Sequence, residues 1–257
     1  MPNNDKGRRR FLGRLLAVGG SLVLTGCDRL SHSKWFTGML SGGEKLNYTL
    51  HRWLLGGDTL AQEFSESDLS PSFRSNGTSS PNDAHYRALA ADGFADYRLE
   101  VSGLVERPGS FSLAELQALP SRTQITRHDC VEGWSAIGKW KGARLSALLE
   151  QVGPRPQARF VVFYCADPMN SQGDRYYESI DLVDAYHEQT ILAYELNDQP
   201  LPIANGAPIR VRVERQLGYK MAKFIMRIEL VENFEQIADG HGGYWEDHSG
   251  YEWYAGI

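Results

Sequence analysis

Cysteine is scarce in this chain, with three residues among 257. They stand at positions 27, 130 and 165, and no Cys-x-x-Cys pair or Cys/His cluster has the spacing of a structural zinc site. A structural zinc site is therefore excluded. A single disulfide between Cys130 and Cys165 and a lone functional thiolate are both open alternatives.

The sequence also lacks a surplus of basic residues and a long apolar run. Lys plus Arg number 27 and Asp plus Glu 32, so the charge does not favour nucleic acid as a partner. The apolar run at 15–24 has about ten residues, too few for a stable helix across the ~30 Å of a bilayer. Hydrophobic residues at 42% and charged residues at 23% exclude a wholly disordered chain, a collagen and a multi-span membrane protein.

The first residues have the pattern of an export signal: a basic head, a short apolar segment and small residues. The net charge of −5 divides into +4 for residues 1–26 and −9 for the rest. Arg8-Arg9-Arg10 before Phe11-Leu12 resembles a twin-arginine signal, which carries folded proteins to the periplasm.

Residues 24–27 (LTGC) resemble a lipoprotein box, in which Cys27 becomes acylated. Asp28 resembles the signal that retains such lipoproteins at the inner membrane. The alternative is a plain cleaved signal. The sequence predicts that residues 1–27 are a twin-arginine signal with a lipoprotein box and that the protein is periplasmic, anchored through Cys27.

The remaining chain divides into three predicted segments. Residues 28–95 predict a tether and an irregular arm that packs on the core, 96–234 a folded domain, and 235–257 an aromatic docked tail. A capping box at Ser112 predicts a short helix after it. Two further helical patterns predict a helix at 144–152 and a helical turn at 180–186. Alternating or continuous apolar patterns predict strands at 97–103, 122–128, 158–165, 190–196, 209–213 and 224–231. Strands outnumber helices and alternate irregularly with them, which predicts an α+β fold with an antiparallel or mixed sheet.

Cys130 is the residue most suited to chemistry. It follows a predicted strand and precedes a Gly-Trp-Ser loop, so the sheet holds the thiol while the loop leaves it room. A thiolate is a soft ligand for a transition metal, or a nucleophile beside His128. The third interpretation is a buried structural cysteine.

Two later blocks carry side chains that suit an anion. Residues 201–210 (LPIANGAPIR) join an Asn-Gly turn to a strand with Arg210, and 218–223 (GYKMAK) place Lys223 before another strand. A guanidinium, an ammonium and backbone amides bind phosphate well. The structural alternatives are an ordinary turn and a solvated pair of lysines.

Together with residues 130–135 (CVEGWS), these blocks resemble the sulfite oxidase superfamily of molybdenum enzymes. The resemblance covers 96–234 and is closest to the bacterial periplasmic branch of methionine sulfoxide reductase catalytic subunits. It implies the mixed-sheet molybdopterin-binding core and a molybdenum–molybdopterin cofactor. It also implies that Cys130 is the metal ligand, that Asn205 and Arg210 bind the pterin and its phosphate, and that Lys223, with the amides of Met221 and Ala222, holds the phosphate.

The resemblance assigns other positions less specifically. Cys165 stands where this branch places a threonine that contacts the cofactor, and the alternative is a core cysteine. Asn76 lies in an arm expected to close over the pterin. Tyr176, or its neighbour Tyr177, would shape the substrate pocket. Arg127 would supply positive charge for an oxyanion, or form an ion pair on the sheet.

The chain ends soon after the predicted domain. Only 27 residues follow Leu230, so we expect neither the immunoglobulin-like dimerisation domain of eukaryotic sulfite oxidases nor a haem domain, and we expect a monomer. In the tail, His241, Glu246 and His248 fit no zinc signature, which favours packing on the domain.

The resemblance implies a periplasmic molybdenum oxidoreductase that performs oxygen-atom transfer on a small or protein-bound substrate. Both S-oxide reduction and sulfite-type oxidation are open. Electrons would be exchanged with a separate redox partner, such as a membrane b-type or soluble c-type cytochrome. The alternatives are a non-catalytic lipid-anchored binding or assembly protein on the same scaffold, and a thiol hydrolase that uses Cys130 and His128.

Overall fold

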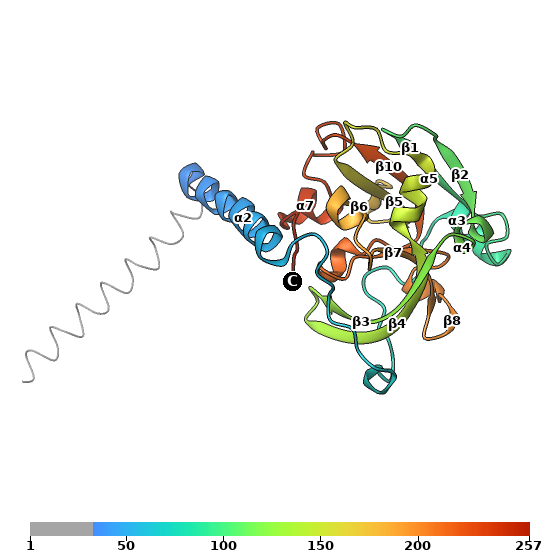
Figure 1. Ribbon diagram of the computed structural model, residues 1–257. Helices are drawn as coiled ribbons and strands as arrows, with labels where there is room; N and C mark the ends of the chain where they lie inside the picture. The colour runs from blue at the N-terminus through green and yellow to red at the C-terminus, as the bar shows by residue number, and fades with distance from the viewer. Residues whose placement is uncertain (1–32) are drawn as a thin grey trace, which may run out of the picture. The chain divides into compact units, whose positions relative to one another are not determined.

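The computed structural model describes residues 33–257 and divides into two compact units at Trp53 and Leu54 (Figure 1). The first unit holds most of helix α2 (Lys34–Leu55), and the second holds every later element. The predicted export signal and lipoprotein box lie outside the described residues. Within residues 33–257, no helix combines the length and the apolar character that a membrane span needs.

Helix α2 corrects the prediction of irregular structure for 28–95. Ser33 caps the helix, since its Oγ accepts a hydrogen bond from the Phe36 amide at 3.2 Å. The helix continues through Gly42 and Gly43, each of which costs about 1 kcal/mol relative to alanine. The Ser33 cap offsets about 1 kcal/mol of that cost.

The first sheet of the larger unit has the strand order β2-β1-β10-β5-β6. β1 and β10 are parallel and all other neighbours are antiparallel, so the sheet is mixed and the fold is α+β, which confirms this part of the prediction. Its strands are β1 (Arg98–Gly103), β2 (Gly109–Ser112), β5 (Phe160–Pro168), β6 (Arg175–Asp181) and β10 (Ile225–Val231).

The second sheet has the order β3-β4-β7-β8, and β9 also pairs with β7. All its pairs are antiparallel. Its strands are β3 (Ser121–Cys130), β4 (Trp134–Arg144), β7 (Ile191–Leu196), β8 (Gln199–Pro200) and β9 (Arg210–Arg212).

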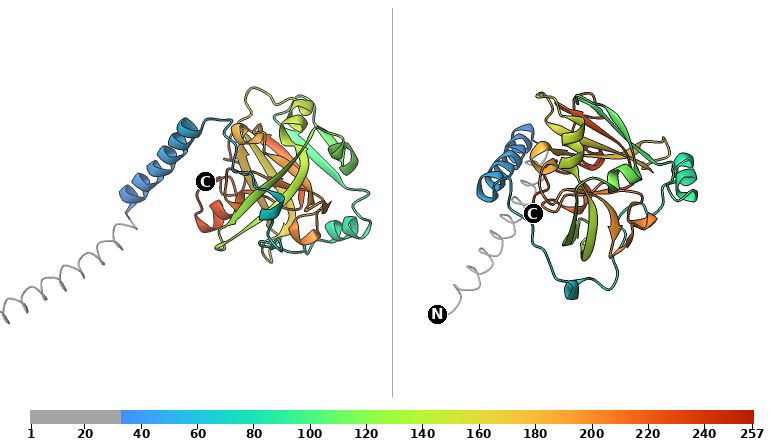
Figure 2. Two further views of the ribbon diagram at one scale, coloured as in Figure 1. Left: turned by 60° about the horizontal axis from the view of Figure 1, so that its bottom comes forward. Right: turned by 45° about the vertical axis from the view of Figure 1, so that its right-hand side comes forward.

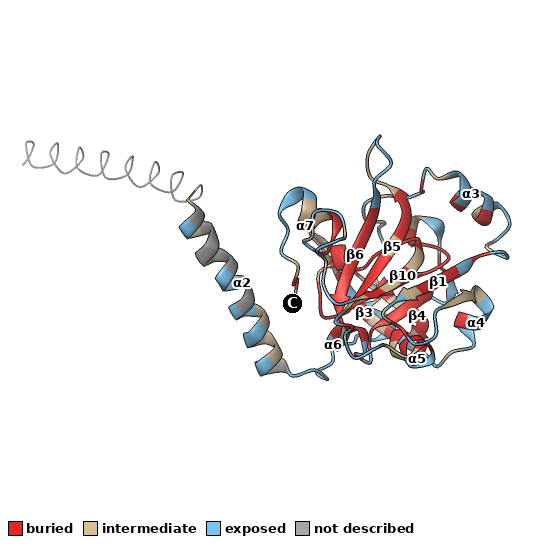
Figure 3. Cartoon of the chain, turned by 90° about the horizontal axis from the view of Figure 1, so that it is seen from above, coloured by how far each residue is buried: buried red, intermediate tan, exposed pale blue. Residues whose placement is uncertain are grey.

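One hydrophobic cluster joins the two sheets, with Val161 and Ile228 from the first and Leu192 and Val211 from the second. Buried residues concentrate in β5 and β6 (Figure 3) and in β7 and β9, whereas α3 (Ala84–Ala91) and α4 (Leu113–Gln117) bury only one side. The other elements are α5 (Leu145–Val152), α6 (Leu182–Ala185), α7 (Tyr244–Ser249) and the 3-10 turns η1 (Glu66–Asp68), η2 (Ile203–Asn205) and η3 (Gly218–Lys220).

Local signals place the short helices as the sequence predicts. Ser112 and Glu115 form the capping box of α4, with hydrogen bonds of 3.2 Å and 2.8 Å between each side chain and the other's amide. α5 ends at Gly153, which has a φ of 68°. The strands β4 and β6, by contrast, are not among the predicted ones.

The arm before α3 packs along the second sheet (Figure 2). The Phe64 amide donates to the Ile125 carbonyl of β3 at 2.9 Å, and the Ser70 amide donates to the Ile137 carbonyl of β4 at 3.1 Å. The ring of Phe73 lies 4.9 Å from that of Trp140. These contacts bring residues 76–78 to the end of the β3–β4 hairpin.

Candidate active site

Cys130 lies beside a cavity of about 300 Å³. It is the last residue of β3, and the turn at 131–133 leads into β4, where Trp134 pairs with it. The side chain is neither fully buried nor exposed, and it is a free thiol. Fifteen residues line the cavity: Asn76, Gly77, Thr78, Cys130, Val131, Glu132, Asp167, Met169, Tyr176, Gly218, Tyr219, Met221, Lys223, Trp245 and Tyr251.

Lys223 and Arg210 place two buried positive charges at this cavity. Lys223 donates to the carbonyls of Asn76 and Thr78 at 2.5 Å, and Arg210 donates to those of Asn205 and Met221 at 3.1 Å. Neither forms a salt bridge within residues 33–257. Burial and neighbouring cations lower the pKa of Arg210 to about 9 and that of Lys223 to about 7. The site therefore has positive charge to offer an anion.

Asn205 and Arg210 lie one layer behind the cavity wall. Gly206 makes this possible, because it turns the chain with a φ of 113°, and a Cβ there would lie 3.1 Å from both Arg210 and Lys223. An isolated bridge pairs Arg210 with Lys223. The Asn-Gly turn thus allows Arg210 and Lys223 to lie next to each other.

Several buried polar atoms here have no hydrogen-bond partner within the described chain: Asn76 Oδ1, Asp167 Oδ1, Asn205 Nδ2 and Arg210 Nε. Buried polar groups are nearly always satisfied in folded proteins. Asn76 and Asp167 line the cavity, so their unpaired oxygens suit a hydrogen-bonding ligand there.

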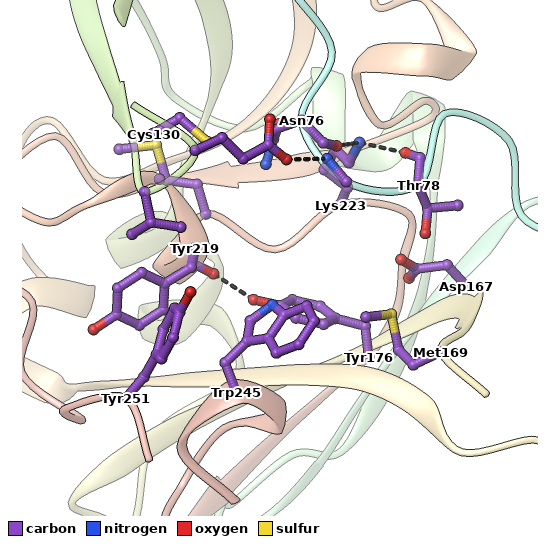
Figure 4. Close-up of a pocket in the computed structure, with 15 residues that line it drawn as sticks. Asn76, Thr78, Cys130, Asp167, Met169, Tyr176, Tyr219, Lys223, Trp245 and Tyr251 are labelled. Atoms are coloured by element: carbon purple, nitrogen blue, oxygen red, sulfur yellow. Dashed lines mark hydrogen bonds between the residues drawn. The ribbon is translucent and has the colours of Figure 1, made fainter. Parts of the chain in front are cut away.

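The opposite wall of the cavity is aromatic (Figure 4). The Tyr176 hydroxyl donates to the Tyr219 carbonyl at 2.5 Å, and Trp245 and Tyr251 come from the C-terminal tail. Tyr177 points elsewhere and donates to Asp247. Of the two tyrosines that the resemblance left open, Tyr176 lines the cavity.

Asp167 brings an unusual carboxyl to the cavity. It is 4% exposed, and burial raises its pKa above the ordinary value. A carboxyl in this state retains a proton to a higher pH, which suits a proton donor. Neither the patterns nor the resemblance pointed to Asp167, and the same is true of Thr78, Met169, Trp245 and Tyr251.

The thiol hydrolase interpretation does not fit this geometry. His128 is fully buried, and Arg212 donates to its Nδ1 at 3.0 Å. Burial and Arg212 lower the pKa of His128, and burial raises that of Cys130. A nucleophilic thiolate with a histidine base needs the opposite shifts.

Gly218 allows this buried histidine to fit. A Cβ at Gly218 would lie 2.4 Å from His128 Nε2, closer than real contacts permit. His128 therefore packs against the start of η3 and supports the loop that carries Met221 and Lys223.

Four expected roles need correction. Arg127 does not line the cavity and pairs with Asp129 at 2.9 Å on the surface, since a residue three before Cys130 in a strand faces the other side. Cys165 is 2% exposed and lies in the core cluster rather than along the cavity. The Met221 amide donates to the Gly218 carbonyl at 3.1 Å and so is already paired, although the residue lines the cavity. Ala222 is buried in the core, and its carbonyl accepts from the Val211 amide.

The tail holds no metal cluster. Within the part of the chain that the structure describes, no group of three His, Cys, Asp or Glu side chains is arranged to bind a metal. His241 pairs with Asp247 at 2.9 Å, His248 stacks on Tyr244, and Glu246 contacts Lys220.

The family model described as "Oxidoreductase molybdopterin binding domain" matches residues 86–237. The chain belongs to this family, the sulfite oxidase family of molybdopterin-dependent oxidoreductases. The "Putative protein-methionine-sulfoxide reductase subunit YedZ1" of Azospira oryzae is 39% identical over 249 residues, 97% of this chain and 87% of the relative.

Two further relatives are the "Protein-methionine-sulfoxide reductase catalytic subunit MsrP" of Xanthomonas campestris pv. campestris and of Xanthomonas axonopodis pv. citri. Each is 38% identical over 151 residues, 55% of this chain and 47% of the relative. Among solved structures, the sulfane dehydrogenase SoxCD from Paracoccus pantotrophus matches with 22% identity and a TM-score of 0.48, over 54% of this chain and 39% of that one.

Family membership gives the chain a molybdenum–molybdopterin cofactor, and the residues at the cavity fit that group. Cys130 offers one sulfur donor of the soft kind that suits this metal. Two buried cations without carboxylate partners suit a phosphate, and the unsatisfied Asn76 and Asn205 amides suit a heterocycle rich in donors and acceptors.

Proposed function

We propose that this protein is an exported molybdenum oxidoreductase that reduces S-oxides, with methionine sulfoxide, free or in proteins, as the substrate class. One observation carries the proposal: a half-buried thiol, a buried lysine without a salt bridge and an aromatic wall line one cavity, and the buried Arg210 lies directly behind that lysine. The names of the relatives, methionine sulfoxide reductase subunits, support the choice of substrate.

Each part of the site has a distinct task. Cys130 would supply the protein's sulfur ligand to the metal, as a thiolate. Arg210 and Lys223 hold the phosphate, while Asn76 and Asn205 bind and orient the pterin. When bound, the molybdenum cofactor supplies the oxygen-atom acceptor and the store for two electrons.

The charges at the cavity favour an S-oxide over sulfite. Lys223 is the only basic residue among those that line it, and Glu132 is acidic. A sulfite dianion needs several cations to leave water, whereas a sulfoxide is neutral and carries apolar substituents. Met169, Trp245 and Tyr251 offer such substituents an apolar surface.

The reaction that we propose balances as follows. The S–O bond of the sulfoxide breaks, two electrons and two protons are consumed, and a thioether and water are formed. Asp167 would deliver one of these protons, since burial raises the pKa of its carboxyl above the ordinary value and places it beside the cavity. Tyr176 fixes the cavity wall through its hydrogen bond to the Tyr219 carbonyl.

The electrons come from a separate redox partner, which we propose to be a membrane b-type or soluble c-type cytochrome. The relatives' names, which describe them as subunits, support a partner protein. We propose a periplasmic location, reached by the twin-arginine route and maintained by a lipid on Cys27, because residues 8–12 and 24–27 carry those signals.

The test is metal analysis of the exported protein followed by two assays. We expect equimolar molybdenum, oxidation of a reduced viologen by methionine sulfoxide, and little reduction of ferricyanide by sulfite. Cys130→Ser should remove the activity and leave the circular dichroism spectrum unchanged. A metal-free protein after native export would contradict the proposal and favour the non-catalytic binding protein. Faster turnover with sulfite than with methionine sulfoxide would show that the protein oxidises sulfite instead of reducing S-oxides.

A further inference from the structure

Helix α2 presents an apolar stripe that the active site does not use. The exposed fractions are 71% for Trp35, 69% for Leu46, 45% for Leu50 and 77% for Trp53. At about 100° per residue, these four positions fall within an arc of about 60° on one side of the helix. None of the described residues of α2 is buried (Figure 3).

The other side of α2 differs in character. Tyr48 lies opposite the stripe, and the Arg52 guanidinium lies 5.2 Å from its ring. The helix sequence contains Lys34, Lys45 and Arg52 against Glu44, a net charge of +2 in a chain of net charge −5. An amphipathic helix with tryptophan on the apolar face and basic residues elsewhere is typical of peptides that lie in a membrane interface.

We propose that α2 lies on the surface of an anionic phospholipid bilayer, with Trp35, Leu46, Leu50 and Trp53 inserted among the acyl chains. The location of α2 in the chain supports this partner. Lys34 follows Cys27 by seven residues, which span at most about 25 Å when extended. This part of the argument depends on the lipid on Cys27 that we proposed above.

A second attachment has a physical role. The lipid on Cys27 would fix one point of the chain to the bilayer, and a helix in the interface adds a second attachment with its own charge preference. The positive charge of α2 is attracted to the anionic lipid surface, whereas the acidic remainder of the chain is repelled by it. The helix would therefore act as the second attachment beside the lipid.

The test uses tryptophan emission of the full chain with vesicles of phosphatidylcholine and phosphatidylglycerol, with and without bromine on their acyl chains. Bromine quenches tryptophan on contact. We expect quenching in the natural protein and its loss in the double variant Trp35→Phe and Trp53→Phe, whose apolar face is retained. Sulfoxide reductase activity with a soluble dye should be unchanged, so failure here is distinguishable from failure of the proposed function.

A matched pair of variants tests whether the apolar side of α2 is the side that contacts the bilayer. Leu46→Glu should lower the vesicle partition coefficient about tenfold, and Tyr48→Glu, with the same added charge on the other side, less than about threefold. Equal emission in brominated and plain vesicles would overturn the proposal. Shielding of Trp35 and Trp53 that rises with protein concentration without vesicles would assign the stripe to a second copy of the chain, and would also overturn it.

Discussion

Lys220 donates to Glu246 at 2.8 Å, and both side chains are fully buried. Lys220 follows Tyr219 at the cavity, and Glu246 belongs to α7 in the tail. Lys220 also pairs with Glu178 of β6 at 2.5 Å. One ammonium thus joins β6, η3 and the tail, and it positions Trp245 at the cavity.

Lys220 has two carboxyl partners, so its substitution and that of Glu246 should have unequal effects on stability. Burial raises the pKa of Glu178 well above its ordinary value, so Glu178 shares the cluster in its protonated form while Glu246 pairs with Lys220. In Glu246→Gln, Glu178 can ionise and pair with Lys220 instead. Lys220→Met leaves two buried carboxyl groups with no cation.

We therefore expect Lys220→Met to lower the free energy of unfolding by about 3–5 kcal/mol and Glu246→Gln by clearly less. Urea denaturation at neutral pH measures both. In the loaded enzyme, Glu246→Gln should raise KM for the sulfoxide more than it lowers kcat, because the wall that carries Trp245 loosens. Equal destabilisation by the two variants would contradict this account of the charges.

Tyr176 and Tyr177 form a natural matched pair, since they are adjacent in β6 and only Tyr176 lines the cavity. Tyr176→Phe loses the hydrogen bond to the Tyr219 carbonyl, and we expect kcat/KM to fall about tenfold, the equivalent of one hydrogen bond. Tyr177→Phe loses the bond to Asp247 and should affect thermal stability rather than turnover. Steady-state kinetics and thermal denaturation of both variants decide the matter, and the reverse pattern would assign the pocket role to Tyr177.

Most of the secondary structure was predictable from local signals. The capping box at Ser112, the stop at Gly153 and the apolar run at 158–165 each depend on neighbouring residues, and each appears where predicted. The strand β4 was not predictable, because Gly138 and Gly142 interrupt its apolar pattern. That strand forms through pairing with β3 and β7, which a local pattern does not contain.

The residues that line the cavity also fall into those that local sequence predicts and those that it does not. Cys130 and Lys223 lie in short blocks with a recognisable sequence, and both line the cavity. Trp245 and Tyr251 reach it only because a buried ion pair holds the tail, an interaction between residues distant in sequence. The position of Arg127, by contrast, follows from strand alternation, since residues at odd separation face opposite sides.

Asp167 gives a prediction about pH. If its protonated carboxyl delivers a proton, turnover must fall as pH rises past its raised pKa. Asp167→Asn keeps the shape but supplies no proton, so we expect a turnover lower by about 100-fold and loss of the alkaline limb that Asp167 produces. The measurement is kcat against pH for both proteins at equal molybdenum content. An alkaline limb that survives in Asp167→Asn would assign it to another group.

Lys223 makes stability depend on pH in the cofactor-free protein. Its pKa is about 7 in the fold and returns to the ordinary value of 10.5 on unfolding. Between these values the unfolded chain binds a proton that the folded chain lacks, so stability rises with pH. It falls as pH drops from 10.5 towards 7, by at most about 1.4 kcal/mol per unit.

Lys223→Met should remove this part of the slope, whereas Lys141→Met, at a half-exposed lysine paired with Glu195, should leave it in place. Urea denaturation at several pH values above neutrality measures the difference. A bound phosphate favours the ammonium form, so the loaded protein should show a smaller slope than the cofactor-free one. If Lys223→Met and the natural protein have the same slope in both states, the amine of Lys223 carries its ordinary charge without an anion. That result would contradict the lowered pKa of Lys223 in the cofactor-free protein.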